Sequence, residues 1–80
     1  MSNTPHTLGD EFPDQMDRIH ALKLADVSFA KLLQNYDAVN DKIHRAETNI
    51  EPVSNEIETE WRKQRLALKD QIARTLAQRS

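Results

Sequence analysis

Two amphipathic helical stripes, separated by a proline-containing break, limit most strongly the folds that this chain can adopt. The first stripe has apolar residues at steps of three or four: Phe29, Leu32, Tyr36, Val39, Ile43 and Ala46. The second has steps of four and one step of seven: Ile57, Trp61, Leu68, Ile72 and Leu76. This spacing is typical of helices with one buried face. The intervening residues 49–55 contain Pro52, which cannot continue a helix. The pattern therefore predicts an antiparallel αα-hairpin.

Capping residues predict where the two long helices begin. The Asp26 carboxylate can accept from free amides that follow it, which predicts a helix over about 27–47 and a break near 25–26. A helix continuous through that point is the alternative. Asn55, followed three residues later by Glu58, fits the N-cap of a last helix over about 55–77.

Opposite charges four residues apart are expected to support these helices. The predicted ion pairs are Asp41–Arg45, Glu58–Arg62 and Asp70–Arg74.

The N-terminal region shows weaker patterning. Pro13 suits the first position of a short helix that extends to about residue 24. Residues 1–11 have no apolar period, so we expect a disordered extension there and a helical domain over 12–80. The predicted fold is all-α: a short N-terminal helix followed by a long, coiled-coil-like antiparallel hairpin.

Size and composition suggest that the hairpin needs further support. The sequence has 80 residues, one glycine, no cysteine and 30% charged residues. One small domain is expected, without disulfides or thiolate metal sites. Because a packed pair of helices leaves the outer face of each helix exposed to solvent, we expect self-association to supply the missing burial.

Some apolar residues lie outside the inner stripes. Leu66 falls about 140° from the main apolar face of the last helix, and Ala73 and Ala77 fall beside it. Leu33 widens the first stripe. We interpret Leu33, Leu66, Ala73 and Ala77 as a protein-interaction surface for a second copy or another helical protein. The alternative is that alanine simply favours helix on a solvated face.

Charge is distributed unevenly along the chain. Residues 1–61 contain five basic and twelve acidic residues, whereas residues 62–80 contain six basic residues and only one acidic residue. The basic set is Arg62, Lys63, Arg65, Lys69, Arg74 and Arg79. Helix dipoles and attraction between antiparallel halves account for this asymmetry. An anion or nucleic-acid surface is the alternative, although stacking aromatics are not interleaved with these cations.

The residue pattern predicts neither catalysis nor a cofactor. His6, His20 and His44 lie on three different segments without zinc-ligand spacing, and Asp41 with His44 forms only half a site. No glycine-rich phosphate loop is present, and Trp61 is expected to pack between the helices. We therefore expect a non-enzymatic protein without metal, cofactor or small-molecule ligand. The sequence has no apolar run long enough to span a membrane, so no membrane partner is expected. It shows no secretion signal, so a cytoplasmic location is expected.

Several segments resemble the YdcH-like family of small bacterial proteins, which have a domain of unknown function. The resemblance includes Ser28-Phe29-Ala30-Lys31-Leu32-Leu33, Tyr36, Asn40-Asp41-Lys42-Ile43-His44-Arg45 and a K-x-x-L-x-L-K-D-x-I segment at Lys63, Leu66, Leu68, Lys69, Asp70 and Ile72. It covers roughly residues 12–78. It implies a bacterial, cytoplasmic helical hairpin that can assemble further, and it carries over no catalytic residue.

Overall fold

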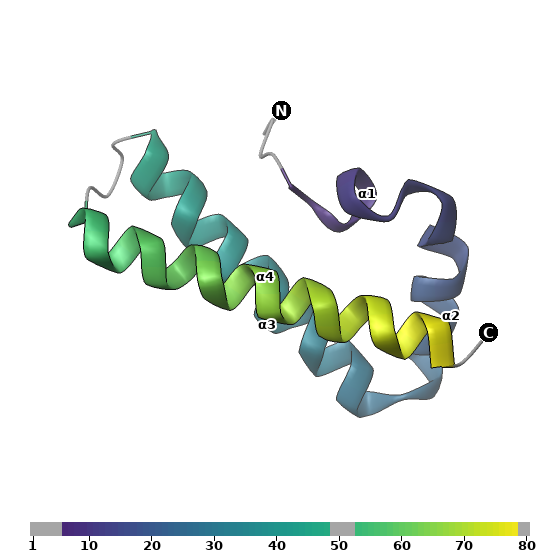
Figure 1. Cartoon of the computed structure of the whole chain (residues 1–80). Coiled ribbons are helices and arrows are strands. Elements are labelled where there is room, and N and C mark those ends of the chain that lie inside the picture. The colour runs from purple at the N-terminus through teal and green to yellow at the C-terminus, as the bar shows by residue number, and fades with distance from the viewer. Residues whose placement is uncertain (1–5, 49–52, 79–80) are drawn as a thin grey trace.

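Every regular element in the computed structural model is helical within the residues it describes, 6–48 and 53–78. The order is α1 (Leu8–Glu11), the 3₁₀ turn η1 (Pro13–Gln15), α2 (Met16–Ala25), α3 (Val27–Glu47) and α4 (Asn55–Gln78). The two long helices, α3 and α4, run antiparallel and pack against each other (Figure 1). The predicted all-α hairpin is therefore confirmed.

A break at Asp26 separates α2 from α3. Asp26 has extended backbone angles, φ −136° and ψ 109°. Its Oδ1 accepts hydrogen bonds from the Ser28 amide at 2.9 Å and the Phe29 amide at 3.2 Å. This cap satisfies two amides that lack intrahelical partners, so the helix starts afresh and α2 folds back onto α3. The predicted bounds of 27–47 are confirmed.

The last helix starts where expected, but its cap lies one residue earlier. Ser54 Oγ accepts from the Ile57 amide at 3.2 Å, and the Ser54 carbonyl accepts from the Glu58 amide at 3.0 Å. The prediction of Asn55 as the cap is therefore wrong, because the short Ser54 hydroxyl already fills that position. Pro52 lies in residues 49–52, outside the described part of the chain.

The expectation of disorder over residues 1–11 is wrong for α1. A reciprocal capping box begins this short helix: the Asp10 amide donates to Thr7 Oγ1 at 3.2 Å, and the Thr7 amide donates to Asp10 Oδ2 at 3.4 Å. A four-residue helix has no apolar period to detect, which explains the missed element. Residues 1–5 lie outside the described residues.

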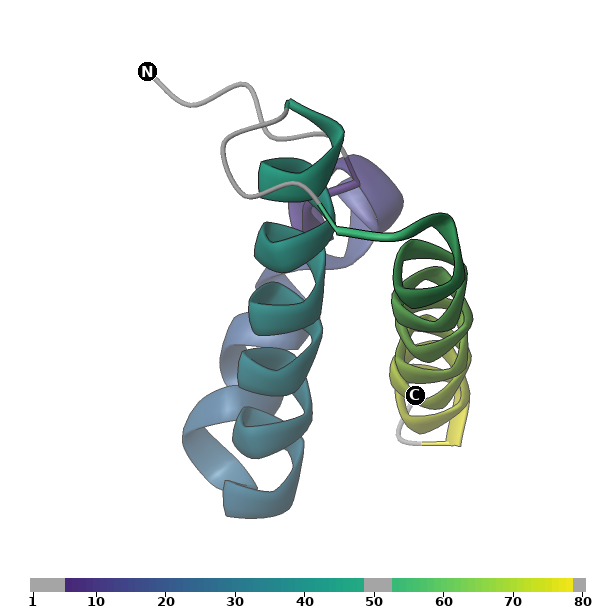
Figure 2. The ribbon, with the colours of Figure 1, turned by 90° about the vertical axis from the view of Figure 1, so that its left-hand side faces the viewer.

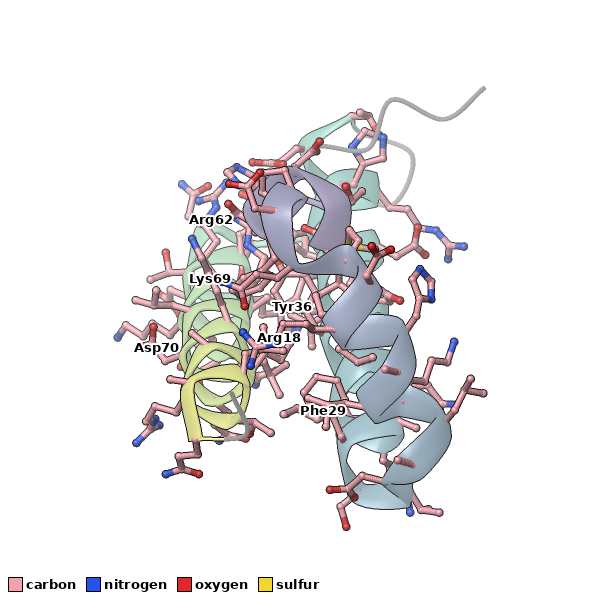
Figure 3. All side chains as sticks on the ribbon, turned by 90° about the vertical axis from the view of Figure 1, so that its right-hand side faces the viewer. Arg18, Phe29, Tyr36, Arg62, Lys69 and Asp70 are labelled. Carbon is pink, nitrogen blue, oxygen red and sulfur yellow. The ribbon has the colours of Figure 1, made fainter. Side chains whose placement is uncertain are left out.

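The main core lies between the hairpin and the N-terminal elements. Its buried members come from α2, α3, α4 and the junction between α1 and η1: Phe12, Ile19, Phe29, Leu33, Tyr36, Ile72 and Leu76. Figure 2 shows α3 and α4 side by side with α1 and α2 behind them. From the opposite side, Figure 3 shows Phe29 and Tyr36 pointing into the space between these elements. The N-terminal segment, residues 6–25, therefore covers one face of the hairpin.

Candidate interaction surfaces

Polar contacts attach the N-terminal segment to both long helices. The Tyr36 hydroxyl donates to the main-chain oxygen of His6 at 2.6 Å, and Arg18 donates to the carbonyl of Leu76. Lys69 Nζ lies 3.4 Å from Glu11 Oε2. Figure 3 shows Arg18, Tyr36 and Lys69 directed toward this region. One face of the hairpin is thus occupied by the chain itself.

The surroundings of this contact region shift the pKa values of Tyr36 and Glu11. Burial raises the pKa of Tyr36 to about 12, and the nearby Glu11 charge acts in the same direction. The phenol consequently remains protonated, and able to donate a hydrogen bond, to a higher pH than an ordinary tyrosine. The pKa of Glu11 is lowered by the hydrogen bond with the His6 side chain and by Lys69, against the opposing effect of burial. His6 Nδ1 lies 2.9 Å from Glu11 Oε1.

Leu33 does not belong to an outer surface. Its exposed fraction is 4%, and it packs in the core with Phe12, Ile19 and Phe29. The predicted interaction role of Leu33 is therefore wrong. The physical reason is that α2 covers this side of α3, so the buried stripe is rotated from the one expected for an isolated hairpin.

The other side of the hairpin carries an open groove. Two hollows of about 500 and 440 Å³ share Asn35 and Gln71 and are lined only by α3, α4 and the Asp26 cap. Three of the apolar residues that line the groove, Leu32, Val39 and Leu68, are half-buried. The predicted inner stripe is thus only partly enclosed, because the N-terminal segment covers the opposite side.

Trp61 lies in the inter-helix region without being fully enclosed. Its side chain is half-buried, and Lys42 Nζ lies 5.8 Å from the centre of its ring. A cation at this distance is attracted by the face of the indole. Trp61 therefore links α3 and α4 through a cation–π contact.

The outer face of α4 exposes the predicted interaction stripe. Leu66 is 59% exposed, and Ala73 and Ala77 are also exposed. Two other large apolar residues, Leu24 and Val27, are exposed at the corner between α2 and α3. The structure thus brings Leu66, Ala73 and Ala77 onto one accessible face, although exposure alone identifies no partner.

Most described cations of the predicted basic surface already make contacts within the chain. Arg62 pairs with Glu47 at 3.1 Å and with Glu58 at 3.9 Å, so the expected Glu58–Arg62 pair is confirmed. Arg65 Nη1 donates to Asn40 Oδ1 at 2.9 Å, and Lys69 contacts Glu11. Lys63 is exposed, and Arg79 lies outside the described residues.

The other two predicted ion pairs have different outcomes. Asp41 and Arg45 are confirmed as a pair at 3.2 Å. Arg74 Nε instead donates to the main-chain oxygen of Asp70 at 3.4 Å, so the predicted side-chain pair is replaced by a backbone contact.

The described residues contain no cluster suited to metal binding. In the ranges 6–48 and 53–78, no group of three or more histidine, cysteine, aspartate or glutamate residues could hold an ion. None of the described helices is both long and apolar enough to cross a membrane.

A buried polar contact between α3 and α4 was not anticipated from the sequence. Asn40 is only 4% exposed, and its side-chain oxygen accepts from Arg65. A signal was present, because Asn40 follows Tyr36 by four residues and Arg65 follows Trp61 by four, which places both on inner faces. The groove carried no such signal, since it depends on which face the N-terminal segment covers.

The fold and its accessible surfaces define a small helical-hairpin protein. A family model described as a protein of unknown function, DUF465, matches residues 29–76. The chain belongs to this family, in agreement with its YdcH-like resemblance. The match covers most of α3 and α4 and begins after the N-terminal segment. No curated protein and no solved structure matches the chain.

Proposed function

We propose that this chain is a non-enzymatic protein–protein interaction module that self-associates through the outer face of α4. The observation that carries the proposal is the exposure of Leu66, 59%, on a helix face that also presents Ala73 and Ala77. A bacterial and cytoplasmic setting accompanies the proposal because of the family resemblance.

Burial of this face provides a physical reason for association. Enclosing a leucine side chain contributes about 1.5–3 kcal/mol relative to leaving it exposed. Small neighbouring side chains let a second helix approach closely, as at helix contacts about 8–10 Å apart. Within one chain, α3 and the N-terminal segment pack against the inner side of α4, so the outer face of α4 stays accessible.

The contacts of Tyr36 and Glu11 support a structural role for these two groups. Tyr36 donates to a main-chain oxygen, and Glu11 is engaged by His6 and Lys69. Both groups thereby hold the N-terminal segment in place. A catalytic acid or base instead needs access to a substrate proton.

A matched pair of leucine substitutions tests this proposal. Leu66→Glu is expected to lower the molar mass measured by light scattering while preserving helical circular dichroism. Leu24→Glu is the control, because Leu24 is 89% exposed on α2 and lies outside the α4 face. Unchanged self-association in Leu66→Glu would contradict the proposal, and loss in Leu24→Glu alone would place the contact at the α2–α3 corner.

Nucleic-acid binding by the basic set is the alternative function. The internal contacts of Arg62, Arg65 and Lys69 reduce the support for it. Binding of this kind would weaken steeply with salt. Retention of DNA or RNA at low salt, lost when Lys63 and Arg74 are changed to Gln, would favour this alternative.

A further inference from the structure

We propose that the partner of the outer α4 face is a second copy of this chain, docked antiparallel about a two-fold axis near Leu66 and Ala67. This inference rests on the proposed function and adds the orientation and register of the two copies.

Six residues form a continuous exposed seam on α4. Their successive spacings alternate between four and three residues: Thr59, Lys63, Leu66, Asp70, Ala73 and Ala77. All six are exposed in this chain. Alternation of four and three keeps these positions on one face of the helix, along which a second helix can lie. Three of the six, Leu66, Ala73 and Ala77, are apolar. The seam therefore extends the interaction stripe into a surface that another long helix can follow.

Charges on this seam are arranged symmetrically around its centre. Lys63 lies three residues before Leu66, and Asp70 lies three residues after Ala67. An antiparallel two-fold pairing therefore places Lys63 opposite Asp70 of the partner subunit, and the same contact occurs twice. Each pair combines opposite charges beside the central leucines.

A second pair of opposite charges lies within one residue of the same symmetry, at the edge of the seam. Glu60 lies six residues before Leu66, and Arg74 lies seven residues after Ala67. The same register brings Glu60 near Arg74 of the partner subunit. A parallel arrangement would instead place Lys63 against Lys63 of the partner subunit and Asp70 against Asp70 of the partner subunit. Like-charge repulsion thus selects the antiparallel orientation.

These charges differ from neighbouring charges that stabilise the monomer. Within residues 6–48 and 53–78, the Glu60, Lys63 and Asp70 side chains form no ion pair. By contrast, Arg62 and Lys69 contact acidic residues of the same chain. The Glu60, Lys63 and Asp70 side chains are therefore available to an intermolecular partner, and polar positions in a helix seam can specify register.

Cysteine substitutions distinguish the two possible helix orientations. The sequence contains no native cysteine, so each variant carries one thiol. Under mild oxidation, Leu66→Cys is expected to form a covalent dimer because its two copies lie beside the axis. Ala73→Cys is expected to remain uncrosslinked, since its copies would lie about 20 Å apart along antiparallel helices. Disulfide formation requires the two Cα atoms to approach within about 7 Å.

A charge exchange tests the register independently. Lys63→Glu and Asp70→Lys are each expected to raise the dimer dissociation constant roughly tenfold, because each change places two like-charge contacts in the dimer. The double variant with both changes restores opposite charges and is expected to recover affinity to within about threefold. Sedimentation equilibrium at low salt measures all three variants.

The outcomes separate the orientation from self-association itself. If Leu66→Glu dissociates the wild-type dimer, the proposed function stands. The antiparallel register would nevertheless be overturned if Ala73→Cys forms a crosslink, or if the double charge variant does not recover affinity. A wild-type chain that remains monomeric throughout would overturn both proposals. Crosslinking of Leu66→Cys alone, with recovery in the double variant, is the result expected for the proposed arrangement.

Discussion

The hydroxyl of Tyr36 donates a 2.6 Å hydrogen bond to the main-chain oxygen of His6, thirty residues earlier in the chain. This contact joins the start of the described chain to the middle of α3. The tyrosine ring is fully buried, whereas His6 is exposed. Tyr36 therefore serves both as core packing and as an anchor for the N-terminal segment.

Tyr36→Phe is expected to preserve the packed ring and remove this anchor. Loss of a hydrogen bond of this type lowers the free energy of unfolding by about 1 kcal/mol. Denaturant unfolding measures the change, and faster amide hydrogen exchange is expected for residues 8–11. An unchanged unfolding midpoint and unchanged exchange would show that the hydrogen bond does not anchor α1.

The contacts of Glu11 predict a pH-dependent stability. Its pKa is lowered in the folded protein by the His6 hydrogen bond and Lys69 despite burial, from a usual value of 4.5. A lowered folded-state pKa contributes stability above the unfolded pKa and loses that contribution as pH falls through the folded pKa. The unfolding free energy is therefore expected to fall as acidification proceeds below about 4.5.

Glu11→Gln isolates this contribution from those of other carboxyl groups. The stability difference between wild type and Glu11→Gln is expected to shrink between about pH 6 and about pH 3. Urea unfolding at each pH measures it. A difference that stays constant over this range would contradict the assigned role of the Glu11 charge.

Truncation of Leu33 is predicted to cost much more stability than truncation of Leu66. Leu33→Ala removes buried core atoms and is expected to lower the free energy of unfolding by about 2–5 kcal/mol. Leu66→Ala is expected to change monomer stability by less than about 0.5 kcal/mol, because Leu66 is exposed. Unfolding at concentrations below dimer formation compares the two, and equal losses would contradict their different placements.

Asp26 is predicted to stabilise the start of α3 through its side-chain oxygen. Asp26→Ala removes acceptors for the Ser28 and Phe29 amides and is expected to cost about 1 kcal/mol. Asp26→Asn is the matched control, since its amide oxygen can accept the same bonds. Thermal unfolding followed by circular dichroism separates the variants; equal losses would indicate that the charge, and not the cap, supplies the stability.

Local chemistry made much of the fold predictable. Asp26 fixes the start of α3, and Pro52 separates the two long apolar patterns, so the helix bounds follow from nearby residues. The capping error at Ser54 has a similarly local origin. Two adjacent polar residues can both cap a helix, and the backbone angles decide which one does.

Tertiary packing determined what the sequence pattern could not. Leu32 and Leu33 are adjacent and both apolar, but only Leu33 is fully buried, because α2 covers its side of α3. A helical wheel describes the faces of one helix and does not specify their neighbours. For Leu66, by contrast, the angle from the inner stripe was large enough to predict exposure directly.

The molar mass of the wild-type chain across a concentration series is the most direct test of self-association. Light scattering is expected to show an increase from the monomer mass of 9.2 kDa toward twice that value as concentration rises. A mass that remains at 9.2 kDa at every concentration, with helicity intact, would contradict self-association through α4.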